Sequence, residues 1–161
     1  MRRPLPRRRR LRIVVYCVLG AVGLLAVAQA IPYGRGHSNP PVTKEPAWDS
    51  SRTRELAKRA CFDCHSNETT WPWYSNVAPE SWLIQRDVDA GRSTLNFSEW
   101  DKPQDTGVGD ITEAVNGGGM PPWYYTLLHS RSGLSKAEKQ ELVAGLARTL
   151  AASPPIGGGS G

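Results

Sequence analysis

Two cysteines and a histidine stand close together near the middle of the chain, in the segment Cys61-Phe62-Asp63-Cys64-His65. On a helix, residues three and four positions apart share a face, so we expect both thiols and the imidazole to point to one side. The C-x-x-C-H spacing is typical of covalent haem attachment, in which two thiols bond the vinyl groups and the imidazole binds the iron. The motif therefore predicts one haem c per chain, attached at Cys61 and Cys64, with His65 as the proximal iron ligand.

Two other chemistries use similar residues. A C-x-x-C pair can form a disulfide or a thioredoxin-like redox centre, but those centres occur in strand-rich αβ surroundings that this sequence does not predict. A zinc site needs four ligands, and the sequence offers no second Cys/His cluster to complete one. Haem attachment is therefore the favoured hypothesis.

The iron has a second axial position, for which Met and His are the common ligands. Met120 is the only methionine besides the initiator, and it lies between three glycines and Pro121-Pro122. Such a loop is poor core material, so we expect Met120 to be the distal iron ligand rather than a gap-filling core residue. His129 and an open or water-filled position are the alternatives.

Five of the six tryptophans follow the motif, between positions 71 and 123. Flat apolar rings suit a porphyrin face, and an indole N–H can bond a propionate or a backbone carbonyl. We therefore expect these side chains to wall the haem pocket: Trp71, Trp73, Trp82, Trp100 and Trp123. The sharper hypothesis, that the segment 71–74 docks a redox partner, is weaker because exposed apolar patches are the exception.

The charge of the chain is concentrated at its start. The sequence has 20 Lys+Arg and 15 Asp+Glu, a formal net charge of +5, but seven of the arginines and no acid lie within residues 1–12. The remaining 13 bases and 15 acids give the rest of the chain a charge of about −2. A nucleic-acid partner needs basic residues on the folded surface, so none is expected.

The segment that follows the arginines is apolar. Residues 13–31 include 19 uncharged positions, roughly 28 Å as a helix, which matches the hydrocarbon thickness of a bilayer. The arginine cluster predicts a cytoplasmic start and an extracytoplasmic remainder, in a single-pass protein of the cytoplasmic membrane. The alternative is a signal peptide cleaved after Ala30, because Ala28-Gln29-Ala30 has the small-x-small form. The length of the run favours the uncleaved anchor.

Composition divides the chain into five predicted segments. These are a cytoplasmic basic tail (1–12), a transmembrane signal-anchor helix (13–31), a Pro/Gly-rich linker (32–46), a haem-binding domain (47–152) and a disordered tail (153–161). Prolines and glycines in the linker cannot hold a helix, so a semi-extended tether is expected.

The haem-binding segment is predicted to be all-α. We expect helices from about residue 50 through Ala60 into the cysteines, from Pro79 to Ala90 with Gly91 as the stop, and from Asp110 to Val115. The last helix follows a Ser135-to-Glu138 capping box and carries an apolar stripe. A core this small would be completed by a large buried cofactor.

Several rare blocks coincide in order with a known family. They are residues 61–69, 71–79, 96–100 and 120–123, which read CFDCHSNET, WPWYSNVAP, NFSEW and MPPW. Over about residues 29–150 the chain resembles a bacterial family of small haem-binding domain proteins with an N-terminal membrane segment. The order of haem motif, distal methionine beside proline and C-terminal helix is also similar to class I cytochromes c. The resemblance implies a cytochrome c-like helical domain around haem and electron transfer.

We therefore expect a one-electron carrier with His65 and Met120 on the iron, not an enzyme. Its expected partners are redox proteins of the membrane or periplasm, and the lipid bilayer through residues 13–31. The alternative is a five-coordinate haem sensor or peroxidase-like protein, and a structural protein with haem as a folding core is a third possibility.

Overall fold

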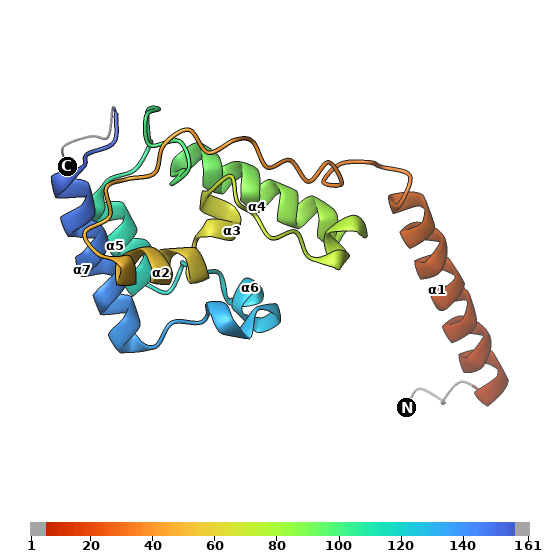
Figure 1. Cartoon of the computed structure of the whole chain (residues 1–161). Helices are drawn as coiled ribbons and strands as arrows, with labels where there is room; N and C mark the ends of the chain where they lie inside the picture. Colours follow the sequence, from red (N-terminus) through yellow and green to blue (C-terminus); the bar gives the residue numbers. More distant parts are fainter. Residues whose placement is uncertain (1–5, 157–161) are drawn as a thin grey trace. The chain divides into compact units, whose positions relative to one another are not determined.

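The computed structural model describes residues 6–156, and its regular elements are all helical (Figure 1). In chain order they are α1 (Arg7–Ala28), α2 (Ser51–Ala60), α3 (Phe62–His65), η1 (Trp73–Asn76), α4 (Glu80–Thr94), α5 (Val108–Asn116), α6 (Trp123–Leu128), η2 (Ser130–Ser132) and α7 (Lys136–Ala152). Over residues 6–156 the backbone forms isolated bridges but no strand. The predicted all-α class is confirmed.

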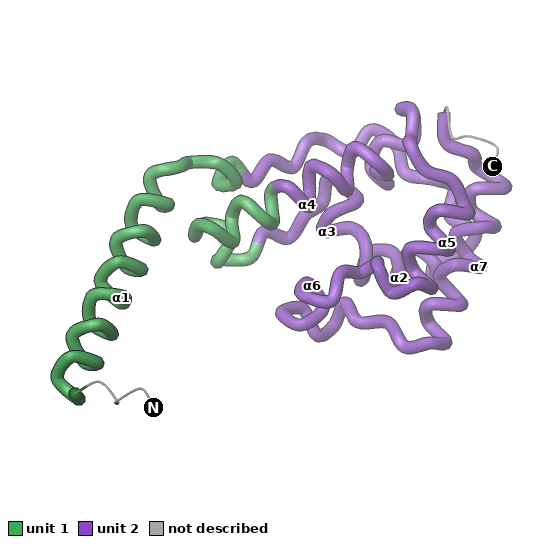
Figure 2. Tube along the Cα trace, turned by 180° about the vertical axis from the view of Figure 1, so that it is seen from behind, with its two compact units in different colours: residues 1–36, 72–85 green, residues 37–71, 86–161 purple. Residues whose placement is uncertain are grey.

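The chain divides into two compact units, coloured separately in Figure 2. The first contains residues 1–36 and 72–85, and the second contains residues 37–71 and 86–161. The boundary falls within α4, between Gln85 and Arg86.

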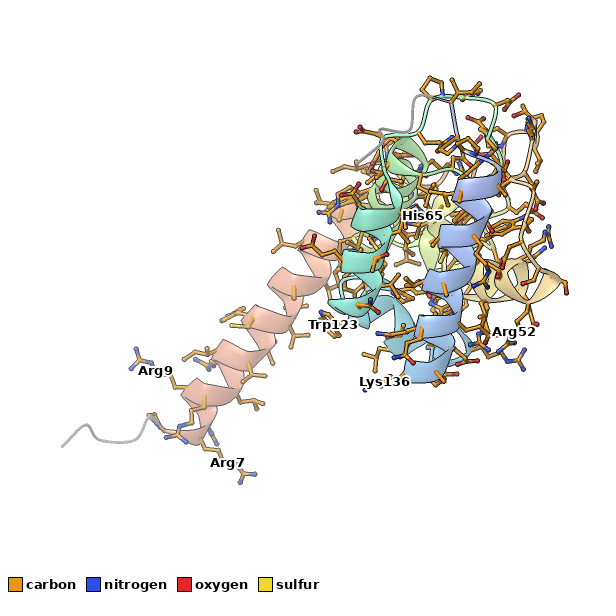
Figure 3. The ribbon with its side chains drawn as sticks, turned by 90° about the vertical axis from the view of Figure 1, so that its left-hand side faces the viewer. Arg7, Arg9, Arg52, His65, Trp123 and Lys136 are labelled. Carbon is orange, nitrogen blue, oxygen red and sulfur yellow. The ribbon has the colours of Figure 1, made fainter. Side chains whose placement is uncertain are left out.

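The first unit contains the apolar helix α1. The helix is long and apolar enough to cross a membrane, and its apolar stretch is not buried in the described structure. It begins at Arg7, earlier than the predicted residue 13, and ends at Ala28. Figure 3 shows the Arg7 and Arg9 side chains extending from its first turns. A signal sequence can have the same length and apolar composition.

The second unit contains the core, where α2 and α7 pack together. They approach closely because Gly145 of α7 has no side chain. A Cβ at this position would lie 2.8 Å from Thr53 Cγ2 of α2, too close for van der Waals contact. One apolar cluster joins these two helices to Phe62 and to residues 95–100: Leu56, Ala57, Phe62, Leu95, Phe97, Trp100, Leu142, Leu146 and Leu150. Burying aliphatic and aromatic side chains of this size contributes about 1.5–3 kcal/mol each, so this cluster is the main source of stability in the unit.

Two of the predicted helices begin as expected. The Ser50 side chain caps α2 by accepting a hydrogen bond from Thr53 N, and Ser135 and Glu138 form the predicted capping box of α7. The Arg59 guanidinium donates to the Glu138 carboxylate and so joins the end of α2 to the start of α7. Backbone donation from Ser135 and the Arg59 contact lower the Glu138 pKa to about 2.

The predicted end of α4 at Gly91 is wrong, because the helix continues to Thr94. Gly91 serves close packing instead of helix termination. A Cβ at this position would lie 2.8 Å from the carbonyl carbon of Cys64 and would contact its oxygen. The missing side chain lets α4 lie directly against the cysteine motif.

The predicted linker contains no helix, but its second part is not a free tether. Thr43 N and Lys44 N both donate to Ser98 O, and Trp100 N donates to Lys44 O. The Arg92 guanidinium also donates to Ser38 O and Asn39 Oδ1. Residues 38–44 are therefore part of the second unit.

The predicted disordered tail lies partly outside the described residues, which end at 156. Before that point Ser153 O accepts a hydrogen bond from the Trp100 indole, and Ile156 O accepts one from Gln104 N. Residues 153–156 are thus held against the domain by backbone contacts.

Gly91→Ala should lower the stability of the haem-loaded chain by about 1–3 kcal/mol, because the new methyl group must displace α4 or the Cys64 backbone. The measurement is the urea unfolding midpoint of the full chain. Gly109→Ala is the matched control, since a Cβ there has nothing within 4 Å in the described structure. Equal midpoints for the two variants would contradict the close packing assigned to Gly91.

Candidate functional site

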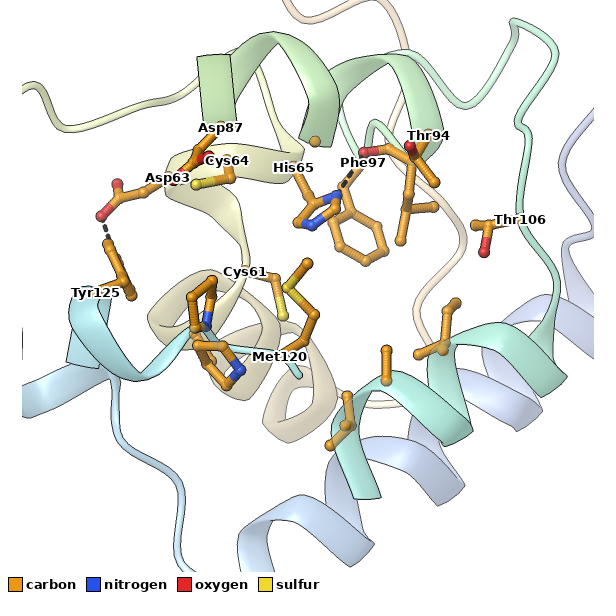
Figure 4. Close-up of a pocket in the computed structure, with 18 of the residues that line it drawn as sticks. Cys61, Asp63, Cys64, His65, Asp87, Thr94, Phe97, Thr106, Met120 and Tyr125 are labelled. Atoms are coloured by element: carbon orange, nitrogen blue, oxygen red, sulfur yellow. Dashed lines mark hydrogen bonds between the residues drawn. The ribbon is translucent and has the colours of Figure 1, made fainter. Parts of the chain in front are cut away.

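An apolar cavity of about 320 Å³ lies within the second unit. This volume is within the range of about 300–1,000 Å³ typical of small-molecule and cofactor sites. Its wall comes from α2 to α7 and the loop before α6 (Figure 4). The apolar side chains that line it include Ala60, Leu95, Phe97, Ile111, Ala114, Val115, Leu134, Leu142 and Leu146.

Cys61 and Cys64 both line this cavity and are free thiols. The expected continuous helix is wrong at this point, because Cys61 has φ −124° and separates α2 from α3. One helical turn still forms, since Cys64 N and His65 N both donate to Cys61 O. The two sulfur atoms therefore reach the same cavity, as the spacing predicted.

The surroundings of both cysteines disfavour the thiolate. Burial raises the pKa of each thiol to about 12, and the Asp87 and Asp63 carboxylates reinforce the effect at Cys64. A redox-active C-x-x-C pair has a lowered thiol pKa. The chemistry of this pair is thus unlike that of a thioredoxin-type centre.

His65 also lines the cavity, and its ring orientation is fixed by the backbone. Its Nδ1 lies 3.0 Å from Leu95 O, which can only accept a hydrogen bond, so Nδ1 carries the proton. The Nε2 lone pair is then available to a metal, the usual arrangement of a ligating histidine. Burial lowers the His65 pKa, which keeps the ring neutral.

Met120 lines the same cavity and is 40% exposed. Its backbone N–H donates to Ala114 O at 2.9 Å, which ties the loop to the end of α5. Figure 4 shows the Met120 side chain and the His65 ring both pointing into the cavity, from different segments. The structure therefore brings together all four residues predicted to hold the haem or its iron.

Two tyrosines that the sequence analysis missed also line the cavity. Tyr125 O–H donates to Asp63 Oδ2 at 2.6 Å, inside the cysteine motif, and Tyr124 O–H donates to Asp87 Oδ2 at 2.9 Å on α4. Burial and the Asp63 carboxylate raise the Tyr125 pKa. These bonds fasten α6, and the Met120 loop before it, to the elements that carry Cys64 and His65.

Three of the tryptophans predicted to wall the haem belong to the second unit and lie elsewhere. Trp100 is 2% exposed, stacks against Phe97 and belongs to the core cluster, so Phe97 lines the cavity in its place. Trp71 stacks on His37, and Trp123 is 74% exposed. None of these three is among the described residues that line the cavity.

Trp73 and Trp82 belong to the first unit, so a role for them beside the cavity stays a prediction. The alternative distal ligand His129 does not line the cavity either. Its ring stacks on Tyr125 with centroids 4.3 Å apart, and its Nδ1 lies 3.0 Å from Tyr125 O.

The family model described as "Haem-binding domain" matches residues 23–148, well over half of the chain and all of the cavity wall. The chain belongs to the haem-binding domain family. No curated protein and no solved structure matches it.

The cavity of this haem-binding domain fits the group that its family binds. Apolar side chains form most of the wall, two thiols stand one helical turn apart, and an imidazole presents its Nε2. Within residues 6–156, no three His, Cys, Asp or Glu side chains gather in a way that would hold a bare metal ion. The apolar wall, the two thiols and the imidazole suit a metal that arrives within a porphyrin.

The sequence contains a signal for the two tyrosine–carboxylate contacts. Tyr124 and Tyr125 follow Met120-Pro121-Pro122 closely, and Asp63 occupies a variable position inside the motif. A buried tyrosine hydroxyl needs a hydrogen-bond partner, and a carboxylate beside the thiols offers one. Which tyrosine meets which carboxylate depends on how α6 folds back, and the spacing alone does not give that.

Proposed function

We propose that the chain is a membrane-anchored c-type haem protein that carries one electron at a time on the extracytoplasmic side. The observation that carries the proposal is that Cys61, Cys64, His65 and Met120 line a single apolar cavity. When bound, haem supplies an Fe(III)/Fe(II) couple.

Each of the four residues then has a distinct role. Cys61 and Cys64 would hold the haem through thioethers to its two vinyl groups, one haem per chain. His65 Nε2 would bind the iron, with the proton kept on Nδ1 by Leu95 O. The thioether sulfur of Met120 would be the second protein ligand, and methionine favours the reduced metal and raises the reduction potential. Two protein ligands would leave the iron no open site for a substrate, so the proposed role is transfer and not catalysis.

The apolar wall and the tyrosine contacts support transfer in a different way. An apolar wall would limit the solvent reorganisation that accompanies a change of charge. Tyr124 and Tyr125 restrain α6 through Asp87 and Asp63, and they thereby help to hold the Met120 loop before it in place. The proposed partners are redox proteins of the membrane or periplasm.

The test of this function is the ferric spectrum of full-length protein made with a cytochrome c maturation system. We expect a low-spin spectrum with the Fe(III)–methionine charge-transfer band, and slow CO binding after reduction. A high-spin ferric spectrum with ready CO binding would favour the five-coordinate sensor or peroxidase instead. Electron exchange with membrane preparations distinguishes a carrier from a protein that uses haem only as a folding core.

Contacts of Gln29 support an uncleaved anchor. Its Nε2 donates to Ala78 O at 2.9 Å and its Oε1 accepts from Ala78 N at 3.1 Å. Cleavage after Ala30 would remove Gln29 and leave both polar groups of Ala78, which is 1% exposed, without these partners. The family match also begins at residue 23, inside α1.

Cell fractionation tests the anchor. We expect the chain in the membrane fraction with residues 1–30 still attached, because α1 remains in the bilayer. The control is the double variant Ala28→Leu/Ala30→Leu, which lacks the small-x-small form. Both this variant and the unchanged chain should have the mass expected for a polypeptide that keeps residues 1–30. A soluble product that begins at Ile31 would show that the signal-peptide alternative is correct.

A further inference from the structure

Segment 72–85 belongs to the same compact unit as α1, although more than forty residues separate the two in the sequence (Figure 2). Gln29, the first residue after α1, exchanges two hydrogen bonds with Ala78 of this segment. The Arg35 guanidinium donates to Gln29 Oε1 at 3.0 Å, and Ser81 Oγ donates to Tyr33 O. The segment is thus fastened to the C-terminal exit of the apolar helix.

Segment 72–85 exposes several apolar and aromatic side chains. Trp73 is 80% exposed and meets Tyr74 edge-on, with ring centroids 5.7 Å apart. Val77 and Leu83 are 41% and 40% exposed. Glu80 is the only charged residue among residues 72–85. Several exposed apolar side chains within one short segment favour contact with a partner or a membrane.

Three features identify the lipid interface as the occupant. The C-terminal end of a membrane helix lies where hydrocarbon gives way to head groups, and Gln29 holds Ala78 at that level. Tryptophan and tyrosine are enriched at this depth, because their rings are apolar and their N–H and O–H groups remain hydrated. A nearly uncharged segment also loses little solvation when it enters the interface.

We propose that segment 72–85 lies in the outer interfacial layer of the bilayer that α1 spans, with the Trp73 ring among the lipid head groups. The inference rests on the proposed membrane anchoring and adds a second membrane contact to it, made by η1, the residues after it and the start of α4. In the first unit, α1, the residues that follow it and segment 72–85 would then all contact the membrane.

Photo-crosslinking in membranes tests the proposal. Full-length, haem-loaded protein carries benzoylphenylalanine in place of Trp73, and its adducts are identified by mass spectrometry after irradiation. We expect lipid adducts several-fold above those obtained with the probe at Gln140, an exposed position of α7 in the second unit. The probe at Leu83 should also yield lipid adducts. An unchanged haem spectrum verifies the fold of each variant.

The possible outcomes distinguish a failure of the interfacial-segment inference from a failure of the proposed membrane anchoring by α1. Protein that stays in membranes after a carbonate wash, but forms no more lipid adducts at 73 and 83 than at 140, would overturn the inference alone. Adducts at 73 with a protein in place of lipid would overturn it too, and would favour a docked redox partner. Release of the chain by carbonate would refute both the anchoring and the interfacial segment.

Discussion

Cys61→Ser/Cys64→Ser should yield a chain whose mass lacks the haem, even after maturation in cells that attach haem to the unchanged protein. Serine oxygen does not form the thioether link, and both sulfur atoms line the cavity where that link is proposed. Any haem held by His65 and Met120 alone should dissociate when the protein is denatured. The single variant Cys64→Ser should retain one thioether at most. Intact-mass spectrometry under denaturing conditions measures the covalently bound haem of the unchanged protein, the double variant and the single variant.

The matched control for this experiment is Cys17→Ser. Cys17 is the third cysteine of the chain and lies in α1, where it is exposed and belongs to the other unit. Its replacement should leave the haem content unchanged. If the double variant kept covalently bound haem, or if Cys17→Ser lost it, the attachment assigned to the C-x-x-C-H motif would be wrong.

Met120→Ala should remove the Fe(III)–methionine charge-transfer band and open one axial position to exogenous ligands. CO should then bind the reduced protein readily. Loss of a thioether ligand that favours the reduced metal should lower the reduction potential by on the order of 100 mV, within the range that axial ligands control. Optical spectra and a potentiometric titration of the full chain measure these effects.

His129→Ala is the control for the distal position. His129 is engaged with Tyr125 and does not line the cavity, so its loss should leave the band and the potential nearly unchanged. Disappearance of the band in His129→Ala, with an unaltered spectrum in Met120→Ala, would reverse the assignment of the distal ligand.

Much of the site could be predicted because its residues are close in sequence. The three positions of the haem motif fall within one helical turn, so local geometry alone brings them to one side. The start of α7 was equally local, since Ser135 and Glu138 satisfy each other's backbone donors. Met120 was predicted from its residue type and from its place beside proline after the motif, an order similar to that of class I cytochromes c.

The errors arose where tertiary packing overrides a local preference. Gly91 has the residue type of a helix stop, yet α4 passes through it because the Cys64 backbone occupies the place of a side chain. Helix α6 was not among the predicted helices, and its tyrosines are held by carboxylates distant in sequence. Neither carboxylate can be paired with its tyrosine from spacing alone.

The tryptophans show the same limit. Their number suggested a wall around the haem, but Trp100 packs one layer behind Phe97 and donates its indole N–H to Ser153 O. The cavity is lined chiefly by aliphatic side chains from α5 and α7, together with Leu95 and Phe97. These residues are unremarkable in the sequence because aliphatic side chains serve a cofactor pocket and an ordinary core equally well.

The most direct test of the account is extraction of the matured, full-length protein with acidified organic solvent after denaturation. Covalent attachment at Cys61 and Cys64 predicts that the haem stays with the polypeptide. A pyridine haemochrome assay of the extracted protein should then give one haem per chain, with the spectrum of a thioether-linked group. Transfer of all the haem into the organic phase would contradict covalent attachment and the proposed c-type carrier with it.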